Sequence, residues 1–160
     1  MGVAGCGKTT VAKLFSQETG ATFYEGDDFH PPENISKMQS GLPLTDVDRA
    51  AWLQALRAII VRALVDREFS AITCSALKEK YRRKLAAGDA RVRFVHLTGT
   101  RKLIASRLKM RRGHFMPATL LASQFAALEP PADALIFNCK LAPEKIVAEL
   151  VHALGIAAID

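Results

Sequence analysis

The 160-residue chain has 22 lysines and arginines against 16 aspartates and glutamates, which gives a net charge of +6 at pH 7. Its hydrophobic content of 49% and charged content of 24% are typical of one globular domain with a sizeable core. No apolar run approaches the roughly 20 residues that cross a bilayer, so a membrane-spanning protein is excluded.

The cysteines and the net charge indicate the cellular compartment of the protein and the classes of partner that it can bind. Cys6, Cys74 and Cys139 are far apart and form no C-x-x-C pair, which favours reduced thiols over disulfides or a zinc site. No secretory signal pattern opens the chain, so we expect a cytoplasmic protein. The positive charge fits either nucleic acid or a pocket for polyanionic nucleotides. Because no basic motif has interleaved aromatic residues, we expect no nucleic-acid partner. Because no apolar run is long enough to span a bilayer, we expect no membrane partner either.

The chain opens on a stretch that fits the phosphate-binding pattern G-x-x-x-x-G-K-[ST]. Glycines let the backbone curl so that its N–H groups point at phosphate oxygens, and the following helix adds its positive end. Lys8 then reaches the β- and γ-phosphates, and the Thr9 hydroxyl ligates Mg²⁺. A chance match in a glycine-rich turn is the alternative, but the amphipathic segment that follows is what the motif requires. The predicted ATP-binding residues here are Gly2, Val3, Ala4, Gly5, Cys6, Gly7, Lys8, Thr9 and Thr10.

A phosphate loop normally leaves the end of a buried strand, and here only Met1 stands before Gly2. Either the start of the chain is misplaced or truncated, or the protein lacks a strand at the centre of its sheet. We therefore expect the first strand to be missing and the sheet to have an unpaired gap.

Further along, apolar patterns alternate between helix and strand. Helices are predicted over 7–19, 33–40, 77–87, 100–111, 117–128 and 143–154, with a long one that Asp46 caps and that carries Trp52 to Leu64. Strands are predicted over 21–25, 69–74, 92–97 and 135–137, and residues 26–32 are predicted as a loop. This alternation indicates a single three-layer α/β/α domain of the P-loop NTPase class, with a mostly parallel sheet. Ligands of such sheets lie beyond the carboxyl ends of the strands.

Acidic residues follow the strand predicted over 21–25. Glu25, Asp27, Asp28 and His30 lie in the loop at its carboxyl end. A kinase needs a carboxylate that accepts or orients the proton of the acceptor hydroxyl, and we expect Asp27 to be that base. Glu25 is a candidate to hold Mg²⁺ through water. A solvated acidic turn is an equally good interpretation from local sequence alone.

Basic side chains gather in three later stretches. Lys37 and Arg49 can hold a carboxylate or several hydroxyls, although a capped helix start with local ion pairs fits the pattern better. Ser75 can cap the next helix beside Lys78, which suits an anion as well as it suits a plain surface helix. Arg111 lies on the same helix face as Arg107, four residues earlier, and the helix runs into a Gly hinge. This pattern fits a nucleotide lid as well as it fits an ordinary solvated helix face. Trp52 and the leucines around it are interpreted as core.

Together these residues resemble the gluconokinase family, small P-loop kinases of the nucleoside-monophosphate-kinase-like class. The similarity spans nearly the whole chain. It is carried by residues 2–9, 26–31, Asn34 with Lys37 and Met38, 41–49 with Trp52 and Leu53, 74–78 with Tyr81 and Arg82, Arg107 and Leu108 with Arg111, 113–117, 123–125 and 128–130. The phosphate loop alone specifies only an NTPase, whereas the later segments are much more specific in combination.

The resemblance implies an ATP- and Mg²⁺-dependent enzyme that phosphorylates the 6-hydroxyl of D-gluconate. It implies one domain over 1–160, a substrate-binding helical insert at about 31–66 and a lid at about 107–117. Lys8, Asp27 and Arg111 would be catalytic, Arg107 and Arg111 would bind ATP, and the family's habit of dimerising suggests a homodimer. The implied gluconate-binding residues are Asp27, His30, Lys37, Asp48, Arg49, Ser75, Lys78, Arg82 and His114.

The sequence departs from the family pattern at several positions. Ala4 and Cys6 stand where serines are usual, and Glu25 stands where an aspartate is usual. Arg83 reverses the charge of the usual aspartate, and residues 138–140 replace a more acidic stretch. Two alternatives therefore remain open: a related small-molecule kinase with a shikimate-like acceptor, and a truncated nucleotide-binding remnant without activity.

Overall fold

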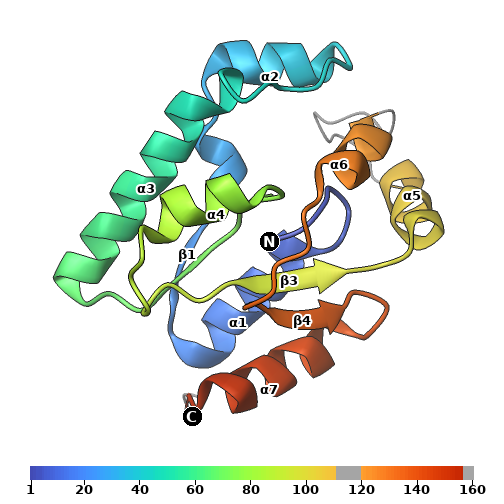
Figure 1. Cartoon of the computed structure of the whole chain (residues 1–160). Helices are drawn as coiled ribbons and strands as arrows, with labels where there is room; N and C mark the ends of the chain where they lie inside the picture. The colour runs from blue at the N-terminus through green and yellow to red at the C-terminus, as the bar shows by residue number, and fades with distance from the viewer. Residues whose placement is uncertain (111–119, 157–160) are drawn as a thin grey trace.

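The computed structural model describes residues 1–110 and 120–156 (Figure 1). Its helices are α1 (Lys8–Thr19), α2 (Pro32–Gln39), α3 (Asp48–Asp66), α4 (Glu79–Ala86), α5 (Arg101–Met110), α6 (Leu121–Ala127) and α7 (Pro143–Leu154), with a 3₁₀ turn, η1, over Gly26–Phe29. Its strands are β1 (Thr22–Tyr24), β2 (Ser70–Ile72), β3 (Val95–Thr98) and β4 (Leu135–Asn138). In this part of the chain, no helix is both long and apolar enough to cross a membrane.

The strands form two parallel pairs. β1 pairs with β2, with Phe23 opposite Ala71, and β3 pairs with β4, with Leu97 opposite Phe137. Each pair is joined through helices, which confirms the predicted α/β class with parallel strands. Within residues 1–110 and 120–156 no strand lies between β2 and β3, and the predicted gap is present there.

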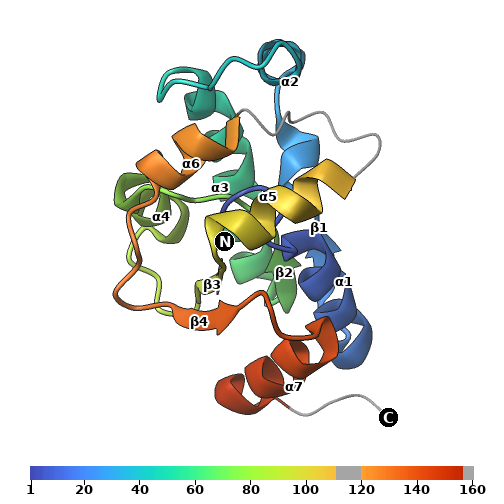
Figure 2. The same cartoon turned by 90° about the vertical axis from the view of Figure 1, so that its right-hand side faces the viewer.

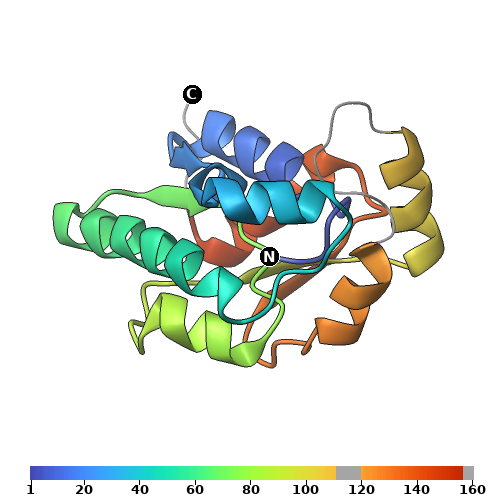
Figure 3. The same ribbon diagram turned by 90° about the horizontal axis from the view of Figure 1, so that it is seen from above.

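Two groups of helices bury the two strand pairs. α1 contacts α7, and their apolar residues share a core with Ile104 of α5 and Leu97 of β3. α3 contacts α4, and a second core forms around Trp52 and Leu56. Figures 2 and 3 show the α3–α4 pair on the side away from α1 and α7. The helices therefore form outer layers, and the phosphate loop lies between them.

Three local features differ from the sequence-based prediction: the start of the loop predicted over residues 26–32, and the helix caps predicted at Asp46 and at Ser75. Residues 26–29 form η1 instead of an open loop, because the Trp52 indole N–H donates to the Gly26 carbonyl at 2.7 Å and fixes this turn. Asp46 does not cap α3. Instead the Thr45 hydroxyl accepts the Asp48 N–H at 3.2 Å, and the Asp48 carboxylate accepts the Thr45 N–H at 2.6 Å, as in a capping box.

The prediction that Ser75 caps the next helix is wrong as well. α4 begins two residues later than expected, at Glu79, with Lys78 at its N-cap and no side-chain cap. The predicted start of a helix at Pro117 lies outside the described residues, and α6 falls within the predicted range 117–128. These changes move the ends of elements and leave their order unchanged.

Candidate active site

The phosphate loop has the backbone that its glycines predict. Gly5 has a φ of 82° and Gly7 a φ of 96°, both in the region that favours glycine. A Cβ on Gly5 would lie 2.8 Å from the Leu108 Cγ of α5, so this helix packs directly on the loop. α1 begins at Lys8, immediately after the curl. Loop N–H groups and the positive helix end therefore meet at one place, as anion binding requires.

Side chains around the loop are arranged for a metal-bound phosphate chain. The Lys8 ammonium donates to the carbonyls of Gly2 and Val3, both at 3.1 Å, so it is folded back over the loop. The Thr9 hydroxyl donates to Glu25 at 2.6 Å. A hydroxyl and a carboxylate are the hard oxygen ligands that Mg²⁺ prefers, directly or through water. No group of three or more acidic, histidine or cysteine side chains suited to a metal occurs in the described residues.

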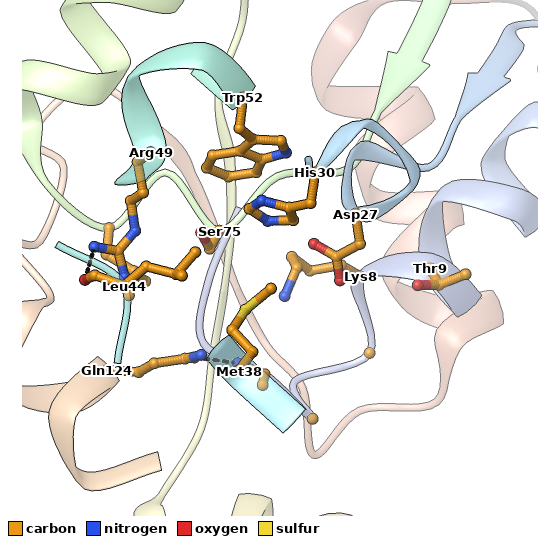
Figure 4. Close-up of a pocket in the computed structure, with 14 residues that line it drawn as sticks. Lys8, Thr9, Asp27, His30, Met38, Leu44, Arg49, Trp52, Ser75 and Gln124 are labelled. Atoms are coloured by element: carbon orange, nitrogen blue, oxygen red, sulfur yellow. Dashed lines mark hydrogen bonds between the residues drawn. The ribbon is translucent and has the colours of Figure 1, made fainter. Parts of the chain in front are cut away.

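Thr73 fixes Glu25, and sequence reasoning missed it. Its hydroxyl donates to the Glu25 carboxylate and accepts the Gly26 N–H at 2.9 Å. A Cβ on Gly26 would lie 1.8 Å from the Thr73 carbonyl oxygen, so only glycine fits there. The start of η1 is therefore held against the end of β2, and this orients the next residue, Asp27. Figure 4 shows the Asp27 carboxylate directed toward Lys8.

His30 forms the wall beside Asp27. Its ring stacks on the Trp52 indole with centroids 4.3 Å apart and planes 12° apart. Burial, with a smaller contribution from the charge of Arg49, lowers the pKa of His30 from 6.5 to about 4. The imidazole is therefore neutral at pH 7 and can both donate and accept a hydrogen bond. The Asn34 amide lies 3.4 Å from its Nδ1.

The loop and the acidic turn border one cavity of about 50 Å³ (Figure 4). It brings together nine of the predicted site residues: Ala4, Gly5, Gly7, Lys8 and Thr9 from the loop, then Asp27, His30 and Arg49, and Ser75 from the segment after β2. The remaining lining residues are Met38, Leu44, Trp52, Leu77 and Gln124. None of these was predicted as a site residue. Apolar residues at helical spacing look like core from sequence, and Trp52 is both core and cavity wall.

Gln124 links α6 to the phosphate loop. Its side-chain carbonyl accepts the Ala4 N–H at 2.6 Å. One signal in the sequence pointed to it, because Gln124 lies in one of the segments that carry the family resemblance. No hydrogen-bonding role was predicted for it, since its partner is 120 residues away.

Four predicted substrate residues lie outside the cavity lining. The Lys37 ammonium pairs with Asp48 at 2.7 Å, and that hydrogen bond holds the pKa of Asp48 well below its usual range. Lys78 pairs with Asp46 at 2.9 Å. Arg82 is buried and donates to the carbonyls of Ala76 and Leu77, both at 3.0 Å.

The predicted lid is described only in part. Arg107 of α5 donates to the Cys139 carbonyl at 2.7 Å, and its guanidinium lies 4.0 Å from where a Cβ on Gly7 would be. It therefore reaches over the phosphate loop, as a nucleotide-binding arginine would. Arg111 and His114 lie outside the described residues.

Comparison with known proteins decides the family. A family model described as shikimate kinase matches residues 4–153. A gluconokinase of Gluconobacter oxydans is 43% identical over 155 residues, covering 95% of this chain and 87% of the relative. The chain belongs to the gluconokinase family, within the shikimate kinase-like P-loop kinases. The thermoresistant gluconokinase of Escherichia coli is a further family member, 40% identical over 96% of this chain and 90% of its own length.

Solved structures of the family agree with the fold. An unliganded sugar kinase from Janibacter sp. superposes with a TM-score of 0.91 at 44% identity, over 98% of this chain and 92% of that one. A gluconokinase from Sinorhizobium meliloti superposes with a TM-score of 0.83 at 42% identity, over 97% and 89%. A shikimate kinase from Bacteroides thetaiotaomicron, with a TM-score of 0.64 at 19% identity, shares the fold. The chain is therefore a P-loop kinase by sequence and by fold.

Proposed function

We propose that the chain transfers the γ-phosphoryl group of ATP to the 6-hydroxyl of D-gluconate, giving 6-phospho-D-gluconate. The observation that carries this proposal is the cavity in which Asp27 faces Lys8 across the mouth of the phosphate loop. The gluconokinase names of relatives about 40% identical over most of the chain support gluconate as the acceptor.

Different residues of the cavity and the phosphate loop carry out different parts of the proposed reaction. Loop N–H groups and Lys8 bind the β- and γ-phosphates, and Arg107 and Arg111 close over the nucleotide. Thr9, with Glu25 through water, would hold the Mg²⁺, which would neutralise phosphate charge. Asp27 takes the proton of the acceptor hydroxyl as that oxygen bonds to phosphorus and the bond from phosphorus to ADP breaks.

The other cavity walls recognise the acceptor. Neutral His30 and the Ser75 hydroxyl hydrogen-bond sugar hydroxyls, and Arg49 attracts the carboxylate. The cavity is smaller than the ~300–1,000 Å³ of ligand pockets because Met38 and Leu44 approach the loop from the insert. We infer that the insert moves outward to admit gluconate. The remaining members of the proposed binding set are Lys37, Asp48, Lys78, Arg82 and His114. To bind gluconate, Lys37 leaves its ion pair with Asp48 and Lys78 leaves its ion pair with Asp46.

We also propose that the protein works in the cytoplasm as a homodimer, with ATP and a sugar acid as its partners and without nucleic acid or membrane. The family's dimerising habit supports the dimer, and the free thiols of Cys6, Cys74 and Cys139 fit the reducing cytoplasm. Light scattering on the purified chain tests the dimer, and a monomer at micromolar concentration would contradict it.

A coupled assay tests the activity. Protein, ATP, Mg²⁺ and gluconate are mixed, and 6-phosphogluconate is measured through its oxidation. Asp27→Asn lowers kcat by about 100-fold and leaves ATP affinity nearly unchanged, whereas the exposed neighbour serves as the control in Asp28→Asn. Equal weakening of turnover and ATP affinity would show that Asp27 serves the metal instead.

A shikimate-like acceptor is the second candidate, because the matching family model is described as shikimate kinase. Competition between gluconate, other sugar acids and shikimate separates the two. Turnover of shikimate but not gluconate would replace the proposal. Calorimetry with ATP addresses the third possibility, since a chain that binds no ATP would be an inactive remnant.

A further inference from the structure

The hydroxyl of Thr73 lies beside Glu25, buried where β2 ends. Thr73 follows β2 directly and is only 4% exposed. Its N–H donates to the Tyr24 carbonyl at 3.0 Å, as part of the parallel ladder with β1. Backbone bonds therefore hold Thr73 next to the residue that follows β1, which is Glu25.

Two partners fix the direction of the Thr73 hydroxyl. Its oxygen accepts the Gly26 N–H at 2.9 Å, and its proton is donated to Oε1 of the Glu25 carboxylate. A hydroxyl has one proton to donate, so this bond uses the whole donor capacity of the side chain. Gly26 is held in turn, because its carbonyl accepts the Trp52 indole N–H at 2.7 Å. The position of the Glu25 carboxylate is therefore set from the end of β2.

Glu25 carries this restraint to the phosphate loop. The Thr73 hydroxyl bonds to Oε1, and the Thr9 hydroxyl of α1 donates to Oε2 at 2.6 Å. One carboxylate thus spans two hydroxyls that come from different elements. Aspartate, which is one methylene shorter, would not span both from the same backbone position. The glutamate at residue 25 and the hydroxyl at residue 73 therefore form a matched pair.

The bond to Glu25 determines what the Thr9 oxygen can bind. Because the Thr9 proton points at the carboxylate, the lone pairs of this oxygen are directed elsewhere. Oxygen lone pairs are what a hard cation such as Mg²⁺ binds. Partners outside the ligand shell orient the ligands of a metal in this way, and their loss typically lowers metal affinity by about 10- to 100-fold.

We propose that Thr73 is a positioning residue for the metal-bound phosphate chain, which acts by fixing Glu25 and, through it, the direction of the Thr9 hydroxyl. The contact also makes residue 25 length-specific, because only the longer carboxylate reaches both hydroxyls. This assigns a function to a buried hydroxyl that lies outside the lining of the active-site cavity. The inference rests on the proposed use of ATP and Mg²⁺, and it does not depend on the acceptor.

Calorimetry with ATP tests this role in Thr73→Val, which keeps the shape of the side chain and removes its hydroxyl. The ATP Kd is measured once in excess Mg²⁺ and once in EDTA, and the ratio of the two values is the readout. Thr73→Val should weaken ATP binding by about 10-fold or more in Mg²⁺ and by less than about 2-fold in EDTA. Thr73→Ser keeps the hydroxyl and should restore the wild-type ratio. An unchanged ratio in Thr73→Val would overturn the proposal.

Glu25→Asp tests the other end of the link. It leaves Thr73 and its bond to Gly26 in place, so it gives a result even if Thr73→Val does not fold. We expect it to weaken ATP binding in Mg²⁺ by about 10-fold or more, and a wild-type ratio would overturn the proposal. In the double variant, the loss should be no greater than the larger single loss, because the two residues act through one contact. Losses that multiply would show that Thr73 and Glu25 act independently, which also contradicts the proposal.

A purely structural role for Thr73 predicts a different result. Tm and both ATP affinities would then fall together in Thr73→Val, and the ratio would stay at its wild-type value. Thr98→Val is the matched control, since Thr98 ends β3 and its hydroxyl donates to the Phe137 carbonyl at 3.3 Å. It should leave the ratio unchanged, and a loss as large as that of Thr73→Val would overturn the proposal.

The titrations contain no gluconate, so an error in the proposed acceptor cannot affect them. A wild-type chain that binds no ATP in either condition would refute the proposed kinase activity, and this inference with it. A wild-type chain that binds ATP more tightly in Mg²⁺, with the same ratio in Thr73→Val, would refute this inference alone.

Discussion

The phosphate side and the acceptor side of the cavity differ in what holds them in place. On the phosphate side, backbone geometry dominates: Gly5 and Gly7 have conformations that favour glycine, and Gly26 leaves no room for a Cβ. On the acceptor side, side-chain ion pairs dominate, and most are partly exposed. Lys37 pairs with Asp48 and Lys78 with Asp46.

This contrast indicates which side can move. The backbone conformations of Gly5 and Gly7, and the hydrogen bond from buried Trp52 to the Gly26 carbonyl, do not depend on a bound ligand. Exposed ion pairs contribute little to stability, typically about 0–1 kcal/mol, and can exchange partners at low cost. The phosphate side is therefore preorganised, and the acceptor side is built to rearrange around a charged substrate.

The largest expected effect concerns the preorganised side. Lys8→Ala should lower kcat by about 100- to 1,000-fold, because it removes a charge aimed at the transferred phosphoryl group. Tm should change by no more than about 2 °C, since the ammonium donates to two loop carbonyls that are only partly buried. The coupled assay and a thermal melt measure both quantities. Lys13→Ala, an exposed lysine of the same helix, is the control, and a large loss of Tm in Lys8→Ala would show a structural role.

Arg82 tests where the boundary between the two sides lies. Arg82→Met should destabilise the fold by about 2–3 kcal/mol, a fall in Tm of roughly 5–10 °C, because two buried carbonyls lose a charged donor. Its exposed neighbour on α4 provides the control in Arg83→Met, which should leave Tm nearly unchanged. If Arg82→Met changed gluconate KM but not Tm, Arg82 would belong to the movable side.

His30 gives a smaller effect that depends on pH. Its pKa is lower in the folded protein, about 4, than its usual 6.5, so the unfolded chain binds more protons between these values. Stability contributed by neutral His30 is therefore complete above pH 6.5 and declines as pH falls toward 4. His30→Gln should reduce the fall in Tm between pH 7 and pH 5. The exposed His152 supplies the control in His152→Gln, and identical pH profiles for the wild type and His30→Gln would contradict this.

The smallest effects are expected for the partly exposed pair of the insert, Lys37 and Asp48. Lys37→Met and Asp48→Asn should each change Tm by less than about 3 °C. Lys37→Met should also raise gluconate KM by about 2- to 5-fold, if this lysine leaves Asp48 for the substrate carboxylate. The Glu79–Arg83 pair, on the exposed face of α4, is a matched control. Unchanged KM in Lys37→Met would mean that the pair only stabilises the insert.

Sequence alone predicted the parts that depend on local rules. The phosphate loop, α1 after Gly7 and α7 from Pro143 follow from glycine positions, a proline in the first helical turn and periodicity, and the structure has them at those places. The order of the strands along the chain followed from short apolar runs. The gap between β2 and β3 was also predicted, and no strand of the described residues fills it.

The parts that sequence did not predict depend on distant partners. The Asp46 carboxylate looks like a helix cap, yet its partners Lys78, Lys80 and Tyr81 lie 32 to 35 residues further on. Gln124 acts on Ala4 across 120 residues. No local propensity encodes such contacts, because they arise only after the elements have packed.

The stack of His30 on Trp52 gives the protein an intrinsic fluorescence signal at the candidate active site. The sequence contains one tryptophan, so all indole emission comes from a wall of the acceptor cavity. Sugar acids, inhibitors and changes of protonation at that wall can therefore be titrated by fluorescence without a label. The same signal follows displacement of the insert in stopped-flow mixing, separately from the chemical step.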